Sequence, residues 1–434
     1  MDLVTSNDWV EMPLGDVAEF QNGGAWNESA YSDSGVKVVR VTNCKNGTID
    51  LDACKFLPEE LFDKYARHEL KVGDVVVATV GSHPTQPKSV VGRASVVPNS
   101  ANGALLNQNA VRLRANGDYL DQAFLRQIVQ ADTFKQYIAA HARGAASQVR
   151  MSIELLKKFP VYMPSLPIQG RIAGVLSAYD DLIENNSRRI EILEEMVRRL
   201  YEEWFVHFRF PGHESMDWQD SELGRIPSDF HVLPLDSVGK IVTGKTPSKK
   251  RPEFFGDEVP FIKLPDMHGQ IFVIRTSEAL STDGAASQKT KMIPANSLCV
   301  SCIGTAGIVV INSEISQTNQ QINTVIPDDA AKREFLYFAL KGLEGTINQY
   351  GATGATMTNL SRGKFAALKI VYPPTGLLHR FSSVSAPLFD QILVLQRKNQ
   401  NLLSQRDLLL PKLVSGEIDV SELEPPVDEE IAAA

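Results

Sequence analysis

The sequence has few of the features that mark several large classes of protein. Its four cysteines in 434 residues are too few for a disulfide scaffold. No apolar run reaches the length of about 18 residues that a membrane span requires. The first ten residues carry Asp2 and Asp8 and lack the apolar core of a secretory signal. We therefore expect a soluble, cytoplasmic protein.

Familiar catalytic motifs are also missing. The sequence has no Asn-Pro-Pro-aromatic motif, no glycine-rich fingerprint for S-adenosylmethionine and no convincing Asp…Glu-x-Lys nuclease arrangement. Its eight histidines are scattered without metal-ligand spacing. We therefore predict no catalytic residue, no metal and no cofactor in this chain.

The composition is that of a globular protein, with 43% hydrophobic and 22% charged residues. This excludes disordered and collagen-like chains. At about 150 residues per domain, the length predicts two to four domains.

The charge is acidic overall but unevenly distributed. The net charge of −8 argues against a nucleic-acid-binding protein. However, residues 88–158 hold ten basic and four acidic residues, and a second basic cluster lies within 240–251. The last 18 residues hold seven acids and no base. Basic patches of this kind permit contact with phosphates without demonstrating it.

The chain repeats itself at a spacing near 210 residues. From Ile172, and again 209 residues later from Phe381, mostly apolar positions recur at steps of three and four. This pattern predicts two long helices that pair lengthwise, the first spanning about 50 Å at about 1.5 Å per residue. The two series are Ile172, Val175, Tyr179, Ile183, Asn186, Ile190, Leu193, Val197, Leu200 and Trp204, and Phe381, Val384, Leu388, Ile392, Leu395, Asn399, Leu402, Arg406, Leu409 and Leu413.

The repeat extends into the globular parts upstream of the helices. Asn107-Gln108 reappears as Asn319-Gln320 at a spacing of 212 residues. Pro387 is expected to kink or delay the second helix. Strand-like runs at 36–41, 75–80 and 307–311, and helix-like segments at 121–140 and 332–343, indicate an α+β fold.

The predicted architecture is two pseudo-twofold-related α/β lobes joined by two long antiparallel, coiled-coil-like helices. The expected boundaries are a first lobe at 1–165, a central helix at 166–210, a polar connector at 211–229, a second lobe at 230–374, a C-terminal helix at 375–416 and an acidic tail at 417–434.

Two short motifs favour structural rather than chemical roles. Residues 239–246 (GKIVTGKT) match the phosphate-loop pattern, but Pro247 and Pro252 disfavour the helix that must follow it. Cys299 and Cys302 form a lone CxxC in an apolar, strand-like run. Buried strand cysteines are therefore favoured over a zinc or redox site.

Three polar loops are candidates for contact with DNA. Residues 244–251 (GKTPSKKR) place donors beside a glycine, and residues 143–150 and 354–359 occupy equivalent places in the two halves. Arginine and lysine bind phosphates, while arginine, glutamine and asparagine can read guanine or adenine edges. The competing interpretation of each residue is a solvated surface loop.

Several segments resemble the DNA specificity subunits of type I restriction–modification systems. Residues 166–186 (LPIQGRIAGVLSAYDDLIENN), continuing to 201–205 (YEEWF), resemble the central helix of that family. The segment 244–262, with GKTPS, PEFFGD and VPFI, is similar to the opening of its target-recognition domains. Residues 406–418 (RDLLLPKLVSGEI) resemble its terminal signature. The first lobe opens differently, with 21–26 (QNGGAW), and Leu378 replaces a frequent glutamine.

This resemblance implies a subunit that reads DNA without catalysing a reaction. Each lobe would read one half of a bipartite, asymmetric target in the major groove, and the helices would set the spacing of the half-sites. Two methyltransferase subunits acting on adenine and two motor-nuclease subunits would be the partners. They would supply S-adenosylmethionine, ATP and magnesium chemistry. The helix residues that we expect to dock these partners are Ile190, Leu193, Tyr201, Trp204, Phe205, Leu409 and Leu413.

The candidate DNA-binding residues come from the basic stretch, the repeated Asn-Gln pairs and the polar loops. They are Lys88, Arg93, Asn107, Gln108, Arg143, Ser147, Gln148, Arg150, Lys245, Thr246, Ser248, Lys249, Lys250, Arg251, Asn319, Gln320, Thr356 and Thr358. Two other functions remain open: a nucleotide-dependent enzyme or nuclease that uses the phosphate-loop-like match, and a coiled-coil scaffold without DNA contact.

Overall fold

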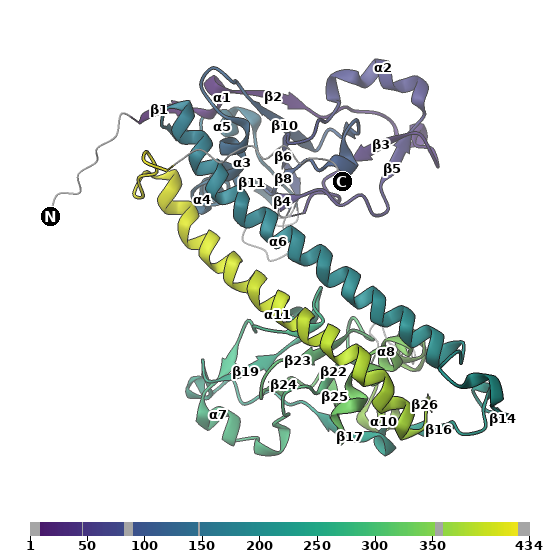
Figure 1. Cartoon of the computed structure of the whole chain (residues 1–434). Helices are drawn as coiled ribbons and strands as arrows, with labels where there is room; N and C mark the ends of the chain where they lie inside the picture. The colour runs from purple at the N-terminus through teal and green to yellow at the C-terminus, as the bar shows by residue number, and fades with distance from the viewer. Residues whose placement is uncertain (1–8, 46, 82–89, 146–147, 352–358, 424–434) are drawn as a thin grey trace. The chain divides into compact units, whose positions relative to one another are not determined.

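The chain forms two compact units, each combining one globular half with parts of both long helices. The computed structural model describes residues 9–45, 47–81, 90–145, 148–351 and 359–423 (Figure 1). The first unit contains residues 1–181 and 403–434, and the second contains residues 182–402. Within the described residues, no helix has the length and apolarity needed to cross a bilayer.

The first unit is built on a five-stranded sheet in the order β2-β10-β6-β8-β4. Its middle strand, Val75–Ala78, is a buried run of β-branched valines ending in alanine, which suits a strand covered on both faces. The five strands are β2 (Ala18–Asn22), β10 (Ala110–Ala115), β6 (Val75–Ala78), β8 (Ala94–Val96) and β4 (Gly47–Thr48).

Smaller sheets and short helices complete the first unit. The smaller sheets are β5-β3-β9 (Lys55–Leu57, Val36–Val39, Leu105–Leu106), β11-β12-β7 (Arg143–Ala145, Gln148–Arg150, Val80–Gly81) and β1-β13 (Val10–Pro13, Pro160–Met163). The helices are α1 (Leu14–Val17), α2 (Phe62–Tyr65), α3 (Gln122–Gln130), α4 (Asp132–His141) and α5 (Ile153–Lys157).

The second unit has a corresponding five-stranded sheet in the order β17-β25-β22-β23-β20. These strands are β17 (Gly239–Thr243), β25 (Ile322–Pro327), β22 (Leu298–Ser301), β23 (Val309–Asn312) and β20 (Phe272–Val273). The other sheets are β18-β21-β19-β24 (Phe255–Gly256, Ala279–Leu280, Val259–Ile262, Gln317–Thr318), β16-β26 (His231–Pro234, Lys369–Tyr372) and β14-β15 (Trp218–Ser221, Gly224–Pro227). The helices are α7 (Thr282–Ala286), α8 (Arg333–Gly342), α9 (Glu344–Gly351) and α10 (Arg362–Ala366).

The two units share one topology, which confirms the α+β class and the internal repeat. In both five-stranded sheets the first three neighbouring pairs are antiparallel and the last pair is parallel. A short parallel pair precedes the second strand of each sheet, β3 with β9 in one unit and β19 with β24 in the other.

The two longest helices, α6 (Leu166–Tyr201) and α11 (Thr375–Val414), pack against each other in an antiparallel manner within each unit. In the second unit Asn186 contacts Asn399, and Trp204, just after the end of α6, packs beside Phe381, near the start of α11. In the first unit Arg406 pairs with Asp180 at 2.7 Å.

An asparagine pair interrupts the apolar contact between the helices in the second unit. Asn186 Nδ2 donates to Asn399 Oδ1 at 2.9 Å, and Asn399 Nδ2 donates to Ser187 Oγ at 3.1 Å. A polar pair at a seam position is satisfied only in one alignment of the two helices. It therefore fixes the register at some cost in stability.

The expected effect of Pro387 on the second helix is partly wrong. Helix α11 begins at Thr375, before this proline, and continues through it to Val414. Phe381, Phe389 and Ile392 on this helix are fully buried in the core of the second unit. This burial outweighs the one backbone hydrogen bond that proline cannot make.

Other predicted segments differ in detail. The helix expected at 121–140 is two helices, because Ala131 is extended between α3 and α4. The polar connector contains the hairpin β14-β15. The acidic tail begins inside the fold, since Ile418 and Val420 pack in the core of the first unit.

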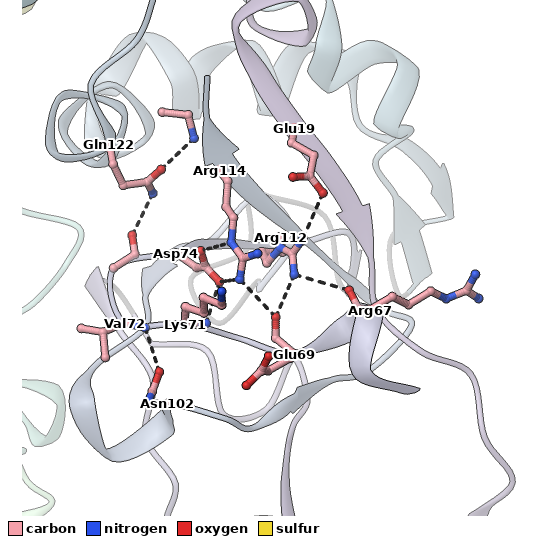
Figure 2. Close-up of polar contacts among 12 residues, drawn as sticks. Glu19, Arg67, Glu69, Lys71, Val72, Asp74, Asn102, Arg112, Arg114 and Gln122 are labelled. Atoms are coloured by element: carbon pink, nitrogen blue, oxygen red, sulfur yellow. Dashed lines mark hydrogen bonds and ion pairs between the residues drawn. The ribbon is translucent and has the colours of Figure 1, made fainter. Parts of the chain in front are cut away.

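A partly buried arginine network holds the strand β10 in the first unit, as Figure 2 shows. Arg112, only 5% exposed, donates to the Glu69 carbonyl at 2.8 Å and forms an ion pair with Glu19 at 3.0 Å. Arg114 donates to both carboxylate oxygens of Asp74, at 2.6 and 2.8 Å. These contacts tie the loop before β6 to β10.

Replacing Arg112 tests how much this network contributes to the free energy of unfolding. Arg112→Met should lower the free energy of unfolding by about 1–3 kcal/mol, because the Glu69 carbonyl loses a buried donor. Lys135→Met is the control, since Lys135 forms only an exposed ion pair with Asp132 and should cost less than about 1 kcal/mol. Urea unfolding followed by circular dichroism measures both. Equal effects would contradict a special role for the Arg112 network.

Candidate nucleic-acid interface

Each unit carries a tight turn at the start of the second strand of its main sheet. We call residues 107–109 and 319–321 the Asn–Gln turns. The Asn107 N–H donates to the Val39 carbonyl at 2.9 Å, and the Asn319 N–H donates to the Ile262 carbonyl at 3.1 Å. The sequence repeat at Asn107-Gln108 and Asn319-Gln320 therefore corresponds to one structural feature that occurs twice.

A glycine lies directly against each Asn–Gln turn. A Cβ atom on Gly23 would lie 2.0 Å from the Asn107 carbonyl oxygen, and one on Gly244 would lie 2.1 Å from that of Asn319. Each glycine N–H donates at 3.1 Å to the backbone carbonyl of the strand residue that follows the turn. This residue is Ala110 in the first unit and Ile322 in the second. Only a residue without a side chain permits this approach.

The two residues of each repeated pair have different environments. Asn107 and Asn319 are buried, whereas Gln108 and Gln320 are exposed. The Asn107 amide donates to Gln108 Oε1 in the first unit. In the second unit the hydroxyl of Thr246 donates to Gln320 Oε1 at 2.7 Å. In both units, therefore, the side-chain oxygen of the exposed glutamine accepts a hydrogen bond from a neighbouring side chain.

Backbone hydrogen bonds connect a further segment of each unit to its Asn–Gln turn, in the same pattern in both units. The Thr79 N–H donates to the Asn109 carbonyl at 2.9 Å, and the Thr79 carbonyl accepts from the Met151 N–H at 2.9 Å. The corresponding links in the second unit run from Gln321 through Cys302 to Leu360, at 2.8 and 2.9 Å.

These links place one exposed polar residue near each turn. Arg150 pairs with Val80 in β12-β7, and Asn359 forms a bridge with Ile303. In the first unit a hollow of about 520 Å³ is lined by Gln108 and Arg150 together.

Gln108, Gln320 and Arg150 are among the residues predicted individually from the sequence, and Asn359 is the last residue of the candidate loop 354–359. It lies 209 residues after Arg150, which is the spacing of the helix repeat.

Residues 244–251, which we call the basic loop, lie beside the Asn–Gln turn of the second unit. The Lys245 N–H donates to the Thr318 carbonyl at 2.9 Å, and the side chain of Lys245 is exposed. Ser248, Lys249 and Lys250 are also exposed. Arg251 is exposed with its guanidinium 5.2 Å from the centre of the Phe254 ring. The loop therefore offers cations close to the held glutamine.

The phosphate-loop-like motif does not have the structure that nucleotide binding requires. Its first five residues form β17, and the next helical segment is the three-residue turn Pro252–Phe254. A phosphate loop instead leads directly into a helix whose N-terminus faces the phosphate. This geometry supports the interpretation of residues 239–246 as a structural segment rather than a nucleotide-binding loop.

The CxxC cysteines are buried as predicted. Burial raises the pKa of Cys299 to about 12 and that of Cys302 to about 11. Both thiols are therefore protonated and unreactive near neutral pH. The described residues contain no group of three or more histidine, cysteine or acidic side chains that could hold a metal.

Of the remaining predicted residues, Arg93 alone has side-chain contacts that the structure describes. Arg93 donates to the Cys44 carbonyl at 2.9 Å, so its guanidinium serves the interior of the first unit. Arg143 and Gln148 lie in β11 and β12. Lys88, Ser147, Thr356 and Thr358 lie outside the described residues.

The helix residues predicted to dock partners pack inside the chain itself. Trp204 and Phe205 are buried in the core of the second unit, and Leu413 is buried in that of the first. Ile190, Leu193, Tyr201 and Leu409 pack against the same cores. A docking surface on α6 would therefore need other side chains, such as Leu182, Ile192 and Met196, which are each more than half exposed.

Comparisons with known proteins place this geometry in context. A family model described as "Type I restriction modification DNA specificity domain" matches residues 6–195 and 227–379. The type I restriction enzyme HindI specificity subunit of Haemophilus influenzae is 29% identical, with 95% of this chain and all of that protein covered. The MjaIX specificity subunit of Methanocaldococcus jannaschii is 26% identical, over 69% of this chain and 70% of that protein.

A solved structure has the same fold. The crystal structure of the type I restriction–modification S subunit from M. genitalium aligns with a TM-score of 0.58 and 16% identity. The alignment covers 95% of this chain and 98% of that one.

The glycine beside the turn provides a direct test of this arrangement. Gly244→Ala should lower the free energy of unfolding by about 1–3 kcal/mol, because the new methyl group overlaps the Asn319 carbonyl. Gly342→Ala, in α8 with open space around it, should instead stabilise the helix by roughly 0.5–1 kcal/mol. Both are measured by urea unfolding. A neutral Gly244→Ala variant would show that the turn does not need this close approach.

Proposed function

The chain belongs to the family of type I restriction–modification DNA specificity domains, and from this premise we propose that it is the DNA-reading subunit of a type I restriction–modification complex. The observation that carries the proposal is the occurrence, in both units, of an exposed glutamine on a glycine-supported Asn–Gln turn. The family match, which extends over both halves, supports the same function.

Each lobe reads one half of a bipartite DNA target. The two lobes have the same backbone links but different side chains at the equivalent positions, Arg150 and Asn359. Different side chains on one framework favour different bases, so the two half-sites differ in sequence. Helices α6 and α11, which contribute to both units, set the separation of the half-sites.

The chain catalyses no reaction itself and acts through partner subunits. Two methyltransferase subunits bind S-adenosylmethionine and methylate adenine, and two motor-nuclease subunits use ATP and magnesium. The exposed apolar side chains of α6, Leu182, Ile192 and Met196, are suited to docking a partner. Double-stranded DNA binds to the lobes.

The two other functions considered from the sequence are less well supported. A nucleotide-binding enzyme would need a helix directly after the motif in 239–246, where the chain has a loop. A scaffold without DNA contact would give no reason for four exposed polar or basic side chains, Lys245, Ser248, Lys249 and Lys250, beside the second Asn–Gln turn.

Reversing the charge of the basic loop tests contact with DNA. The triple variant Lys249→Glu, Lys250→Glu, Arg251→Glu should bind a duplex of arbitrary sequence more weakly. The slope of log affinity against log salt should fall by about 0.9 for each phosphate that the variant no longer neutralises, up to about 2.7. Fluorescence anisotropy over a salt series measures both quantities, using the full chain with its methylation subunits.

Lys135→Glu is the control for this experiment, because Lys135 is an exposed cation of the first unit outside the proposed interface. It should leave the salt slope unchanged. An unaltered affinity and slope in the triple variant would favour the scaffold function instead.

A further inference from the structure

The hollow beside the first Asn–Gln turn is lined by the polar side chains of Gln108, Arg150 and Glu154. Arg150 is exposed, and the structure records no hydrogen bond or ion pair of its guanidinium with any described residue. Glu154 lines the same hollow, but its carboxylate pairs with Lys157 Nζ at 3.0 Å. Within the described part of the chain, the charge of Arg150 therefore has no partner and can serve a ligand.

The orientation of Gln108 makes it a donor toward the same hollow. Its Oε1 accepts from the Asn107 amide, and Asn107 is only 8% exposed, so this contact is supported from inside the fold. The structure records no hydrogen bond from Gln108 Nε2 to any described residue. The two N–H groups on that atom are free to donate to a ligand.

Gln108 Nε2 and the Arg150 guanidinium together offer donors to this hollow. Among the base edges of the major groove, only guanine presents two acceptors, N7 and O6, with no donor. Adenine and cytosine each present an amino group there, which would face donors and lack a partner. The chemistry of this pair therefore selects guanine over the other purine.

We propose that Gln108 and Arg150 are specificity-determining residues that read a guanine in the half-site of the first lobe. This inference rests on the proposed function and adds the base and the two residues that read it. The second lobe has Asn359 at the position of Arg150. Asparagine carries both a donor and an acceptor, so a preference for guanine on these grounds is expected in the first lobe alone.

The test is the DNA motif methylated by variants of the full chain. Wild type, Arg150→Ala, Arg150→Lys and Gln108→Ala are each co-expressed with the methylation subunits, and N6-methyladenine is located by single-molecule sequencing. In wild type, one half-site should contain a guanine. Arg150→Ala and Gln108→Ala should lower the preference for that guanine by about 5- to 150-fold and leave all other positions intact. Arg150→Lys, which keeps one charged donor, should have an intermediate effect.

Matched variants distinguish the loss of a base contact from a loss of folding or of overall DNA affinity. Asn359→Ala should change only the other half-site, and Lys135→Ala should change neither. Thermal unfolding of each purified complex checks that the variants are folded. Because Arg150 is exposed, its replacement should leave the unfolding temperature unchanged, whereas Gln108→Ala removes the acceptor of the buried Asn107 amide and should lower it modestly.

Two results would overturn the inference while leaving the proposed function intact. The first is an unchanged motif with uniformly reduced methylation, which is the behaviour of residues that contact phosphates. The second is a relaxed position that is not guanine. A wild-type complex that assembles but methylates no bipartite motif would instead overturn the proposed function, and this inference with it.

Discussion

The close approach of a glycine to an asparagine carbonyl is the constraint on which the candidate interface depends. At Gly23 and Gly244 a Cβ atom would lie 2.0 and 2.1 Å from the carbonyl oxygen of the adjacent turn. Because the glycine has no side chain, the turn lies against the neighbouring strand. Its asparagine is then buried and its glutamine faces outward. The two lobes carry different side chains on this shared arrangement, Arg150 in one and Asn359 in the other, and we propose that they present these side chains to DNA.

Much of the fold follows from the periodicity of the sequence. The apolar series from Ile172 and from Phe381 predict the two long helices, and the structure confirms both. The Asn-Gln repeat predicts equivalent positions in the two lobes, and the shared backbone links confirm this. Pro387 shows where local propensity fails, because burial of Phe381 and Phe389 maintains the helix around it. Such tertiary packing is not visible in the residues near the proline.

The site was less predictable than the fold. Charge alone cannot distinguish Arg150, exposed beside the turn, from Arg93, which donates to the Cys44 carbonyl. The helix residues expected to dock partners are large apolar side chains on the seam between the helices. The same property buries Trp204 and Leu413 within the chain's own cores. Asn359 carries no charge, and the sequence marks it only as the last residue of the candidate loop 354–359, so its equivalence to Arg150 in the backbone pairing is what distinguishes it from its neighbours.

The central claim is that two equivalent lobes each read one part of a divided DNA target. The most direct measurement is the N6-methyladenine pattern in genomic DNA from cells that express the wild-type chain with its methylation subunits. We predict one new motif in two short, different parts separated by an unspecified spacer. A stable complex that methylates a single continuous sequence, or no defined sequence, would contradict this claim.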